Sequence, residues 1–143
     1  MAAVLVVDTN VLSELMRPTP DARVASWVAK RATSTLHLTA ISEAELRFGL
    51  TVMPPGKRRD GLVKGLERIL HTGFANRILP FDSAAASAYA EIAAVRQAMG
   101  RPIPEADCQI AAIARARGMA VVTRNVRDFA DTGIDVVDPW TDT

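Results

Sequence analysis

This chain of 143 residues has little of several residue types, and each shortage excludes a class of protein. It has a single cysteine, Cys108, so a disulfide framework or a cysteine-based zinc site is excluded. No apolar run approaches the roughly 20 residues that a membrane helix needs. Met1 leads directly into an apolar segment, without the basic start and cleavage site of a signal peptide. These absences indicate a cytoplasmic protein with no membrane segment.

Aromatic residues are also scarce, at 5% of a chain that is 49% hydrophobic, so Ala, Val, Leu and Ile must build the core. The 17 basic and 16 acidic residues give a net charge of +1, so the chain is not a polycation. Arginine supplies most of the basic residues and suits contacts to phosphate, although genome base composition produces the same bias. Net charge therefore neither supports nor excludes a nucleic-acid substrate.

Apolar runs that alternate with helical patterns predict an α/β fold whose parallel sheet is covered on both faces. The length fits a single domain over residues 1–143. We expect strands at about 2–7, 36–38, 77–79, 119–123 and 134–137. We expect helices at about 22–30, 42–53, 57–70, 83–99 and 104–117.

Asp8 ends the first apolar run, which reads as a strand buried on both faces. In open α/β sheets, ligands bind in the crevice beyond the carboxyl ends of the strands, which is where this acid lies. The alternative is that Asp8 caps the following helix through its backbone N–H groups. The segment alone does not separate a ligand-binding acid from a helix cap.

Glu45 shares one helical face with Ile41, Phe48 and Val52, so the pattern places an acid on a face that we expect to be buried. The alternative is a capping box in which Ser42 is the N-cap and Glu45 the third helical residue. Capping explains the residue type but not its alignment with large apolar side chains.

Asp107 follows Pro104 by three residues and falls in the first turn of its helix, on the same face as Ile110 and Ala111. The helix dipole favours an acid there by roughly 0.3–1 kcal/mol, which is the structural alternative. Asn125 and Asp128 follow the strand at 119–123, where turn formation alone would also favour them.

Together these positions predict one cluster of oxygen ligands at a single edge of the sheet. Two carboxylates about 5 Å apart repel each other by roughly 3 kcal/mol at an effective dielectric constant near 20. A cation relieves that repulsion, and an all-oxygen set suits Mg²⁺ or Mn²⁺. Such an acid cluster with its metal is suited to phosphoryl transfer, in which the metal activates water.

Four segments, in order, resemble the PIN-domain ribonucleases, above all the VapC toxins of bacterial toxin–antitoxin pairs, including the FitB-like branch. These segments are residues 6–14, 42–49, 107–112 and 123–129, and residues 77–82 and 138–140 also look like that branch. The resemblance implies a PIN-like α/β/α sandwich with a central, mostly parallel sheet of about five strands.

The resemblance also implies the site. Its catalytic residues would be Asp8, Glu45, Asp107 and Asn125, with Asp8 and Asp107 binding Mg²⁺ (or Mn²⁺). The family's fourth position is acidic, whereas Asn125 is neutral, so a second ion should bind weakly and Asp128 is a candidate replacement. Surrounding hydrogen bonds would come from Thr9, Asn10 and Thr123.

The implied function is that of a metal-dependent endoribonuclease, the toxin of a type II toxin–antitoxin pair, which hydrolyses RNA phosphodiester bonds, often in tRNA loops. The implied partners are RNA, a second copy in a homodimer, and an antitoxin whose DNA-binding domain makes the only contact with operator DNA. Arg47, Arg124 and Arg127 are nearest to the acids in sequence and are candidates to follow the RNA backbone.

Three other functions compete with this interpretation. An aspartyl-phosphate phosphatase would need a second acid where Asn10 stands, and a receiver domain would need an acid after the third strand, where Leu79 is followed by Pro80. The non-enzymatic alternative is a metal-stabilised binding module that acts only within a DNA-bound antitoxin complex.

Overall fold

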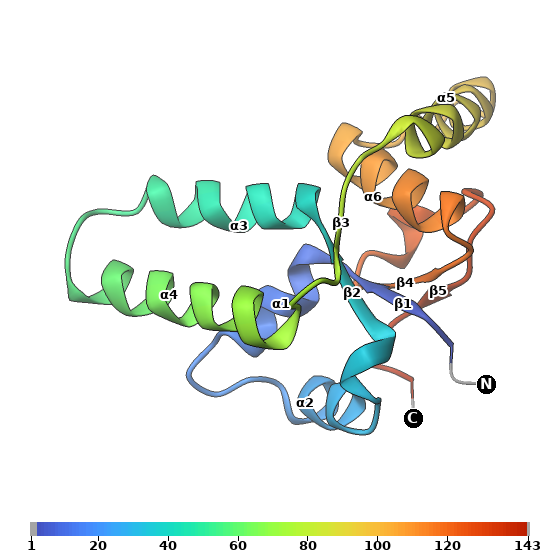
Figure 1. The fold of residues 1–143 in the computed structure, drawn as a ribbon. Helices are drawn as coiled ribbons and strands as arrows, with labels where there is room; N and C mark the ends of the chain where they lie inside the picture. The colour runs from blue at the N-terminus through green and yellow to red at the C-terminus, as the bar shows by residue number, and fades with distance from the viewer. Residues whose placement is uncertain (1–2, 143) are drawn as a thin grey trace.

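The computed structural model describes residues 3–142 and has a parallel five-stranded sheet between two groups of helices (Figure 1). The strand order is β3-β2-β1-β4-β5, and every neighbouring pair is parallel. The strands are β1 (Leu5–Val7), β2 (Leu36–Thr39), β3 (Ile78–Leu79), β4 (Ala120–Val122) and β5 (Val136–Val137). The predicted α/β class is confirmed.

Within residues 3–142, six α-helices connect and cover these strands. They are α1 (Thr9–Leu15), α2 (Ala22–Ala29), α3 (Ala40–Thr51), α4 (Lys57–Arg68), α5 (Ser83–Ala98) and α6 (Glu105–Ala116). Shorter turns are η1 (Thr33–Thr35), the π-helical η2 (Ile69–Gly73) and η3 (Val126–Phe129). No helix within residues 3–142 combines the length and the apolar character needed to cross a membrane.

The two faces of the sheet contribute to two separate cores. Leu5 and Val7 pack with side chains from α1, α2 and α4, whereas Val6 packs with side chains from α5 and α6. This alternation follows from the two-residue period of a strand. The first strand is therefore buried on both sides, as its unbroken apolar run predicts, although it begins at Leu5 and residue 2 lies outside the described residues.

The strand order reverses between β1 and β4, because the chain passes from β1 to β2 and β3 and then returns to the other side of β1. Ligands of open α/β sheets bind at such a switch point. Asp8 and Thr123 lie there, directly after β1 and β4. A receiver domain has the order 2-1-3-4-5, so this topology excludes that alternative.

The helix expected at about 42–53 is α3, but the Ser42 N-cap of the capping-box alternative and the expected burial of the Glu45 face are both wrong. Thr39, and not Ser42, is its N-cap, and the Thr39 hydroxyl accepts a 3.1 Å hydrogen bond from the Ser42 backbone N–H. Phe48 and Val52 are 60% and 66% exposed, so the face that they share with Glu45 is not buried. The reason is tertiary, since α3 and α4 project together as a hairpin beyond the sheet (Figure 1).

Candidate active site

Asp8 is the N-cap of α1 and also a buried acid at the switch point. Its Oδ1 accepts a 2.8 Å hydrogen bond from the Thr9 backbone N–H. Its Oδ2 accepts hydrogen bonds from the Thr123 hydroxyl at 2.7 Å and from Asn10 Nδ2 at 3.3 Å. Burial raises the pKa of Asp8, while the bonds from Thr123 and Thr9 oppose that rise. Capping α1 and serving as a ligand-binding acid are therefore not exclusive alternatives for Asp8, because its position fits both.

Glu45 reaches the same place from the second turn of α3. Its Oε1 accepts a 2.7 Å hydrogen bond from the Thr9 hydroxyl. Because a carboxylate only accepts, the single Thr9 hydroxyl hydrogen is used there, and the Ser42 hydroxyl, 2.8 Å away, donates to Thr9 in turn. The buried Ser42 thus orients Glu45, whose own side chain is exposed. The capping-box alternative fails because Glu45 lies beyond the first turn.

Asp107 lies in the first turn of α6, as predicted, and is half-buried. Ile110, Ala111 and Ala114, on the same face, are fully buried. Burial, followed by the charges of Asp8, Asp128 and Glu45, raises the pKa of Asp107 to about 6. These carboxylates are therefore close enough to destabilise one another's charged forms.

The segment after β4 brings a neutral and an acidic group to this edge. The Asn125 backbone N–H donates a 3.0 Å hydrogen bond to the Thr123 hydroxyl, and its exposed side chain faces the same hollow as Asp8. Asp128 lies one helical turn further on, in η3, and its charge raises the pKa values of both Asp8 and Asp107. Both groups thus lie near the buried acids.

These side chains surround a hollow of about 550 Å³. It is lined by Asp8, Thr9, Asn10, Ser13, Glu14, Arg17, Glu45, Asp107 and Asn125. We call it the acid pocket. Within residues 3–142, no three Asp, Glu, His or Cys side chains lie close enough together to surround one ion. A cation in the acid pocket would therefore take several ligands from water or from a bound phosphate, as Mg²⁺ commonly does.

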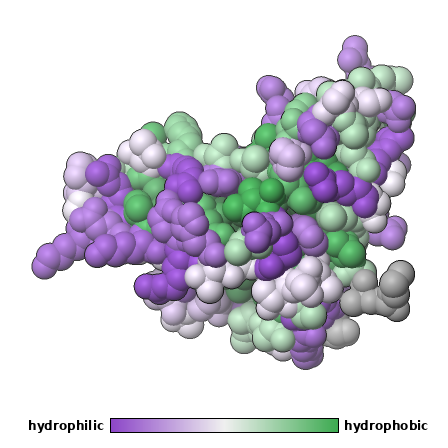
Figure 2. Space-filling model, viewed as in Figure 1, coloured by the Kyte–Doolittle hydropathy of each residue, from purple (hydrophilic) through white to green (hydrophobic). Residues whose placement is uncertain are grey.

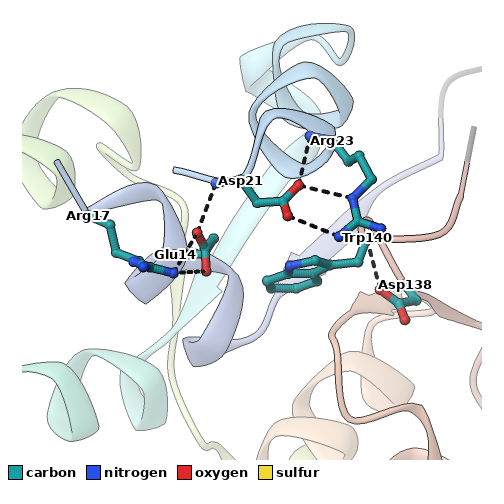
Figure 3. Close-up of polar contacts among 6 residues, drawn as sticks. All are labelled: Glu14, Arg17, Asp21, Arg23, Asp138 and Trp140. Atoms are coloured by element: carbon teal, nitrogen blue, oxygen red, sulfur yellow. Dashed lines mark hydrogen bonds and ion pairs between the residues drawn. The ribbon is translucent and has the colours of Figure 1, made fainter. Parts of the chain in front are cut away.

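Glu14 and Arg17 line the acid pocket but were missed by the sequence analysis. Figure 3 shows the buried Glu14 carboxylate accepting hydrogen bonds from the Asp21 backbone N–H at 2.9 Å and from Arg17 Nη1 at 3.3 Å. Asn10, Glu14 and Arg17 are spaced by four and three residues, as on one face of a helix, although α1 ends at Leu15 and Arg17 lies two residues beyond it. That spacing, starting two residues after Asp8, is the signal that would have found them.

The three arginines predicted to lie nearest to the acids are not among the residues that line the acid pocket. Arg47 pairs with Glu43 at 2.8 Å and with Glu67 at 2.5 Å, beside a different hollow between α3 and α4. Arg124 lies over the Trp140 ring, 4.9 Å from its centroid, and Arg127 is exposed in η3. Arg17 is the arginine that lines the acid pocket, and whether the other three contact RNA stays a prediction.

Comparisons with known proteins agree with this geometry. The PIN domain family model matches residues 5–134. The chain is 44% identical to the VapC ribonuclease Y4jK of Sinorhizobium fredii over 136 residues, which covers 95% of this chain and 97% of that protein. It is 38% identical to toxin FitB of Neisseria gonorrhoeae over 138 residues, covering 96% and 99% of the two chains.

A solved structure shares the whole architecture. The structure of FitAB bound to the IR36 DNA fragment superposes with a TM-score of 0.91 at 37% identity and covers 97% of each chain. The family model, both relatives and this structure match nearly the whole length of the chain. The chain therefore belongs to the PIN-domain family, in the branch that includes the VapC ribonucleases and toxin FitB.

Proposed function

We propose that this protein is a metal-dependent endoribonuclease, the toxin of a type II toxin–antitoxin pair, which hydrolyses RNA phosphodiester bonds. The observation that carries the proposal is the acid pocket itself. Its lining includes Asp8, Glu45, Asp107 and Asn125, which four separate segments bring to the switch point of the sheet. The likeness to a VapC ribonuclease along nearly the whole chain supports the same activity.

A divalent ion fits the donors of the acid pocket. The side chains of Asp8, Glu45, Asp107 and Asn125 offer only oxygen, which Mg²⁺ and Mn²⁺ prefer. The raised pKa of Asp107, about 6, reflects burial and carboxylate repulsion that a cation would relieve. We propose that Asp8 and Asp107 hold the ion, which would supply Lewis-acid stabilisation of the phosphate and an activated water.

The chain's own residues would orient and position the reactants. Thr9 and Ser42 hold the Glu45 carboxylate toward the acid pocket, where we propose that it accepts a proton from the attacking water. Arg17 uses Nη1 to contact Glu14 and is 65% exposed, so we propose that it also binds a phosphate of the RNA strand. Asn125 is proposed to assist as a neutral ligand, with Asp128 as the additional acid.

We propose three partners besides RNA. The relative FitB is named as a toxin, and the similar solved structure is that of FitAB bound to a DNA fragment. By analogy, this chain would bind an antitoxin whose DNA-binding domain alone contacts the operator. We also propose a homodimer, because Figure 2 shows apolar surface between the α3–α4 hairpin and α5. Large exposed apolar side chains occur at the end of α3, just before α5 and at the end of α5, and they are Phe48 and the C-cap Val52, Phe81, and Val95 and the C-cap Met99.

The deciding experiment is cleavage of total RNA, including tRNA, by the purified chain freed of antitoxin. We expect cleavage with Mg²⁺ or Mn²⁺, none with EDTA, and a loss of more than about a hundredfold in Asp107→Asn. Metal at 100 times its dissociation constant should also stabilise the fold by about 2.7 kcal/mol, and Asp8→Ala should abolish that gain. If the chain binds the metal but leaves the RNA intact in every condition, the proposed ribonuclease activity is contradicted.

The neutral Asn125 supports a second candidate function, a catalytically weak, metal-stabilised binding module within a DNA-bound antitoxin complex. This module would show the metal-dependent gain in stability without RNA cleavage. The two functions therefore differ in cleavage alone, and the experiment above separates them.

A further inference from the structure

Arg96 is a buried cation that the proposed reaction does not use. It lies on the inner face of α5 in line with Ala85, Ala88 and Ile92, and it is 5% exposed. The ion pairs formed within residues 3–142 do not include it. A charged side chain is seldom buried unless ion pairs or hydrogen bonds compensate for the lost water. The hydrogen bonds of Arg96 must therefore provide that compensation.

Those hydrogen bonds join two segments of the chain. Arg96 Nε donates to the Arg101 carbonyl at 2.7 Å, and Nη1 donates to the carbonyls of Asp128 at 2.9 Å and Ala130 at 3.0 Å. Arg101 lies in the connection that leads into α6, which carries Asp107. Asp128 and Ala130 belong to the segment after β4. One guanidinium therefore ties the approach to Asp107 to the segment that carries Asp128.

The acceptors are neutral carbonyls, so the positive charge of Arg96 is not neutralised by its own hydrogen bonds. That charge acts on Asp107, where it opposes the effect of the neighbouring carboxylates. Arg96 thus lies close to the acids without lining the acid pocket, and it holds the Asp128 backbone directly.

We infer that Arg96 is a positioning residue of the acid pocket, which fixes Asp128 relative to Asp107 through the backbone of the segment after β4. The inference rests on the proposed function, because the arrangement that Arg96 fixes is the one proposed to bind a divalent ion. Its planar fork is suited to holding carbonyls from two segments at once, which the single ammonium of lysine does not reproduce.

Two physical effects of removing Arg96 have opposite signs, and this makes the inference testable. Electrostatics alone predicts that Mn²⁺ binds more tightly to Arg96→Met, because a positive charge near the ion has gone. Loss of positioning predicts weaker binding, because Asp128 is no longer held near Asp107. We expect Mn²⁺ affinity to fall about tenfold, equal to about 1.4 kcal/mol.

The experiment measures Mn²⁺ binding to the whole metal-free chain by calorimetry, below the melting temperature of every variant. Arg96→Lys keeps the charge and loses the fork, so we expect it to weaken binding as well. Arg115→Met is the matched control, because Arg115 also links α6 to α5, through a 2.7 Å contact with Glu91. We expect Arg115→Met to bind Mn²⁺ like the wild type.

A double-mutant cycle tests whether Asp128 is the group positioned. In an Asp128→Ala background, we expect Arg96→Met to weaken Mn²⁺ binding by less than about threefold, because interacting residues are not additive. Amide hydrogen exchange of residues 126–129 in the metal-free protein gives a second measurement, and we expect faster exchange there in both Arg96 variants than in Arg115→Met.

The outcomes separate the two proposals. Failure of the wild type to bind Mn²⁺ would overturn the proposed metal site. Mn²⁺ binding by Arg96→Lys equal to that of the wild type, with unchanged exchange at 126–129, would overturn the role of Arg96 and leave the metal site intact. An equal effect of Arg96→Met with and without Asp128 would overturn the assignment of Asp128 as the positioned group. If Arg96→Met does not fold, Arg96→Lys and the exchange measurement still decide.

Discussion

The Thr123 hydroxyl donates a 2.7 Å hydrogen bond to the Asp8 carboxylate across 115 residues of sequence. The two residues meet because β1 and β4 are neighbours in the sheet, with Val7 opposite Val122. The same hydroxyl accepts hydrogen bonds from Asn10 Nδ2 and from the Asn125 backbone N–H. Thr123 therefore connects the segment after β1 to the segment after β4 through its hydrogen bonds.

Removing this hydroxyl should destabilise the fold and weaken metal binding. In Thr123→Val the buried Asp8 loses a donor, so we expect the free energy of unfolding to fall by about 1–3 kcal/mol. Mn²⁺ affinity should fall too, because Asp8 and Asn125 are no longer held together. Denaturant unfolding and calorimetry measure these effects. Thr123→Ser keeps the hydroxyl and should behave like the wild type; an equal loss in both variants would mean that packing, and not the hydrogen bond, matters.

The raised pKa of Asp107 predicts how stability depends on pH in the metal-free protein. The pKa is about 6 in the folded chain and 3.8 ordinarily, so the folded state holds a proton that the unfolded state has released. Stability is therefore lost as pH rises from about 4 to 6, and the loss is complete above that range. Because Asp107 is only half-buried, we expect a loss of about 1 kcal/mol.

Asp107→Asn provides the comparison, since it cannot titrate. The difference in unfolding free energy between the variant and the wild type should grow between pH 4 and pH 7, as measured by denaturant titration. A difference that stays constant with pH would show that Asp107 titrates near its ordinary pKa.

Arg17 should contribute to RNA binding through a phosphate. We expect Arg17→Ala to weaken binding of a non-cleaved RNA and to reduce the slope of affinity against salt by about one, as loss of one phosphate contact does. Binding to the Asp107→Asn form, titrated at several salt concentrations, measures both. Lys30→Ala, which removes a cation from a hollow beside Trp27, is the control. An unchanged salt slope in Arg17→Ala would remove Arg17 from the RNA path.

The exposed apolar side chains of α3 should hold the proposed homodimer together. Phe48 lies in the last turn of α3, and Val52, four residues further on, is its C-cap. We expect Phe48→Glu with Val52→Glu to give monomers in analytical ultracentrifugation, because charges would be buried unpaired in the interface. Val63→Glu, an equally apolar exposed position on α4, is the comparison. A dimer that persists in the double variant would place the interface elsewhere.

Asn125→Asp should tighten Mn²⁺ binding, because it adds a charge at the edge of the acid pocket. Calorimetry at pH 7 measures the change. Asn125→Ala is the counterpart, and it should weaken binding only if the amide oxygen contacts the ion. If both variants bind like the wild type, Asn125 serves only to form the turn after β4.

Much of the fold follows from local patterns. The apolar run before Asp8 and the helices at about 22–30, 83–99 and 104–117 were all predicted, because each depends on neighbours along the chain. Gly118 has φ +66°, the left-handed conformation that a helix end favours in glycine. Asp107 lies in the first turn of α6, as predicted, because Pro104 marks the start of the helix and so determines which face carries Asp107.

Glu45 shows where local patterns stop. Glu45 lies at the predicted acid cluster, but the reason given for it is wrong, because the face that it shares with Phe48 and Val52 is exposed. Its position depends on Thr9, 36 residues away, and on the buried Ser42. Arg47 lies close to Glu45 in sequence but pairs with Glu67, 20 residues away on α4. Periodicity reports which residues share a face, but not what covers that face.

Short spacings along the chain therefore suffice for the α/β class, for the acids that end strands or begin helices, and for the family motifs. The groups that surround those acids follow from how the strands and helices pack. This packing brings Thr123 to Asp8, Thr9 to Glu45, and Arg96 to the Asp128 carbonyl. The physical reason is that these contacts depend on strand order and helix packing, which bring together segments that no local pattern relates.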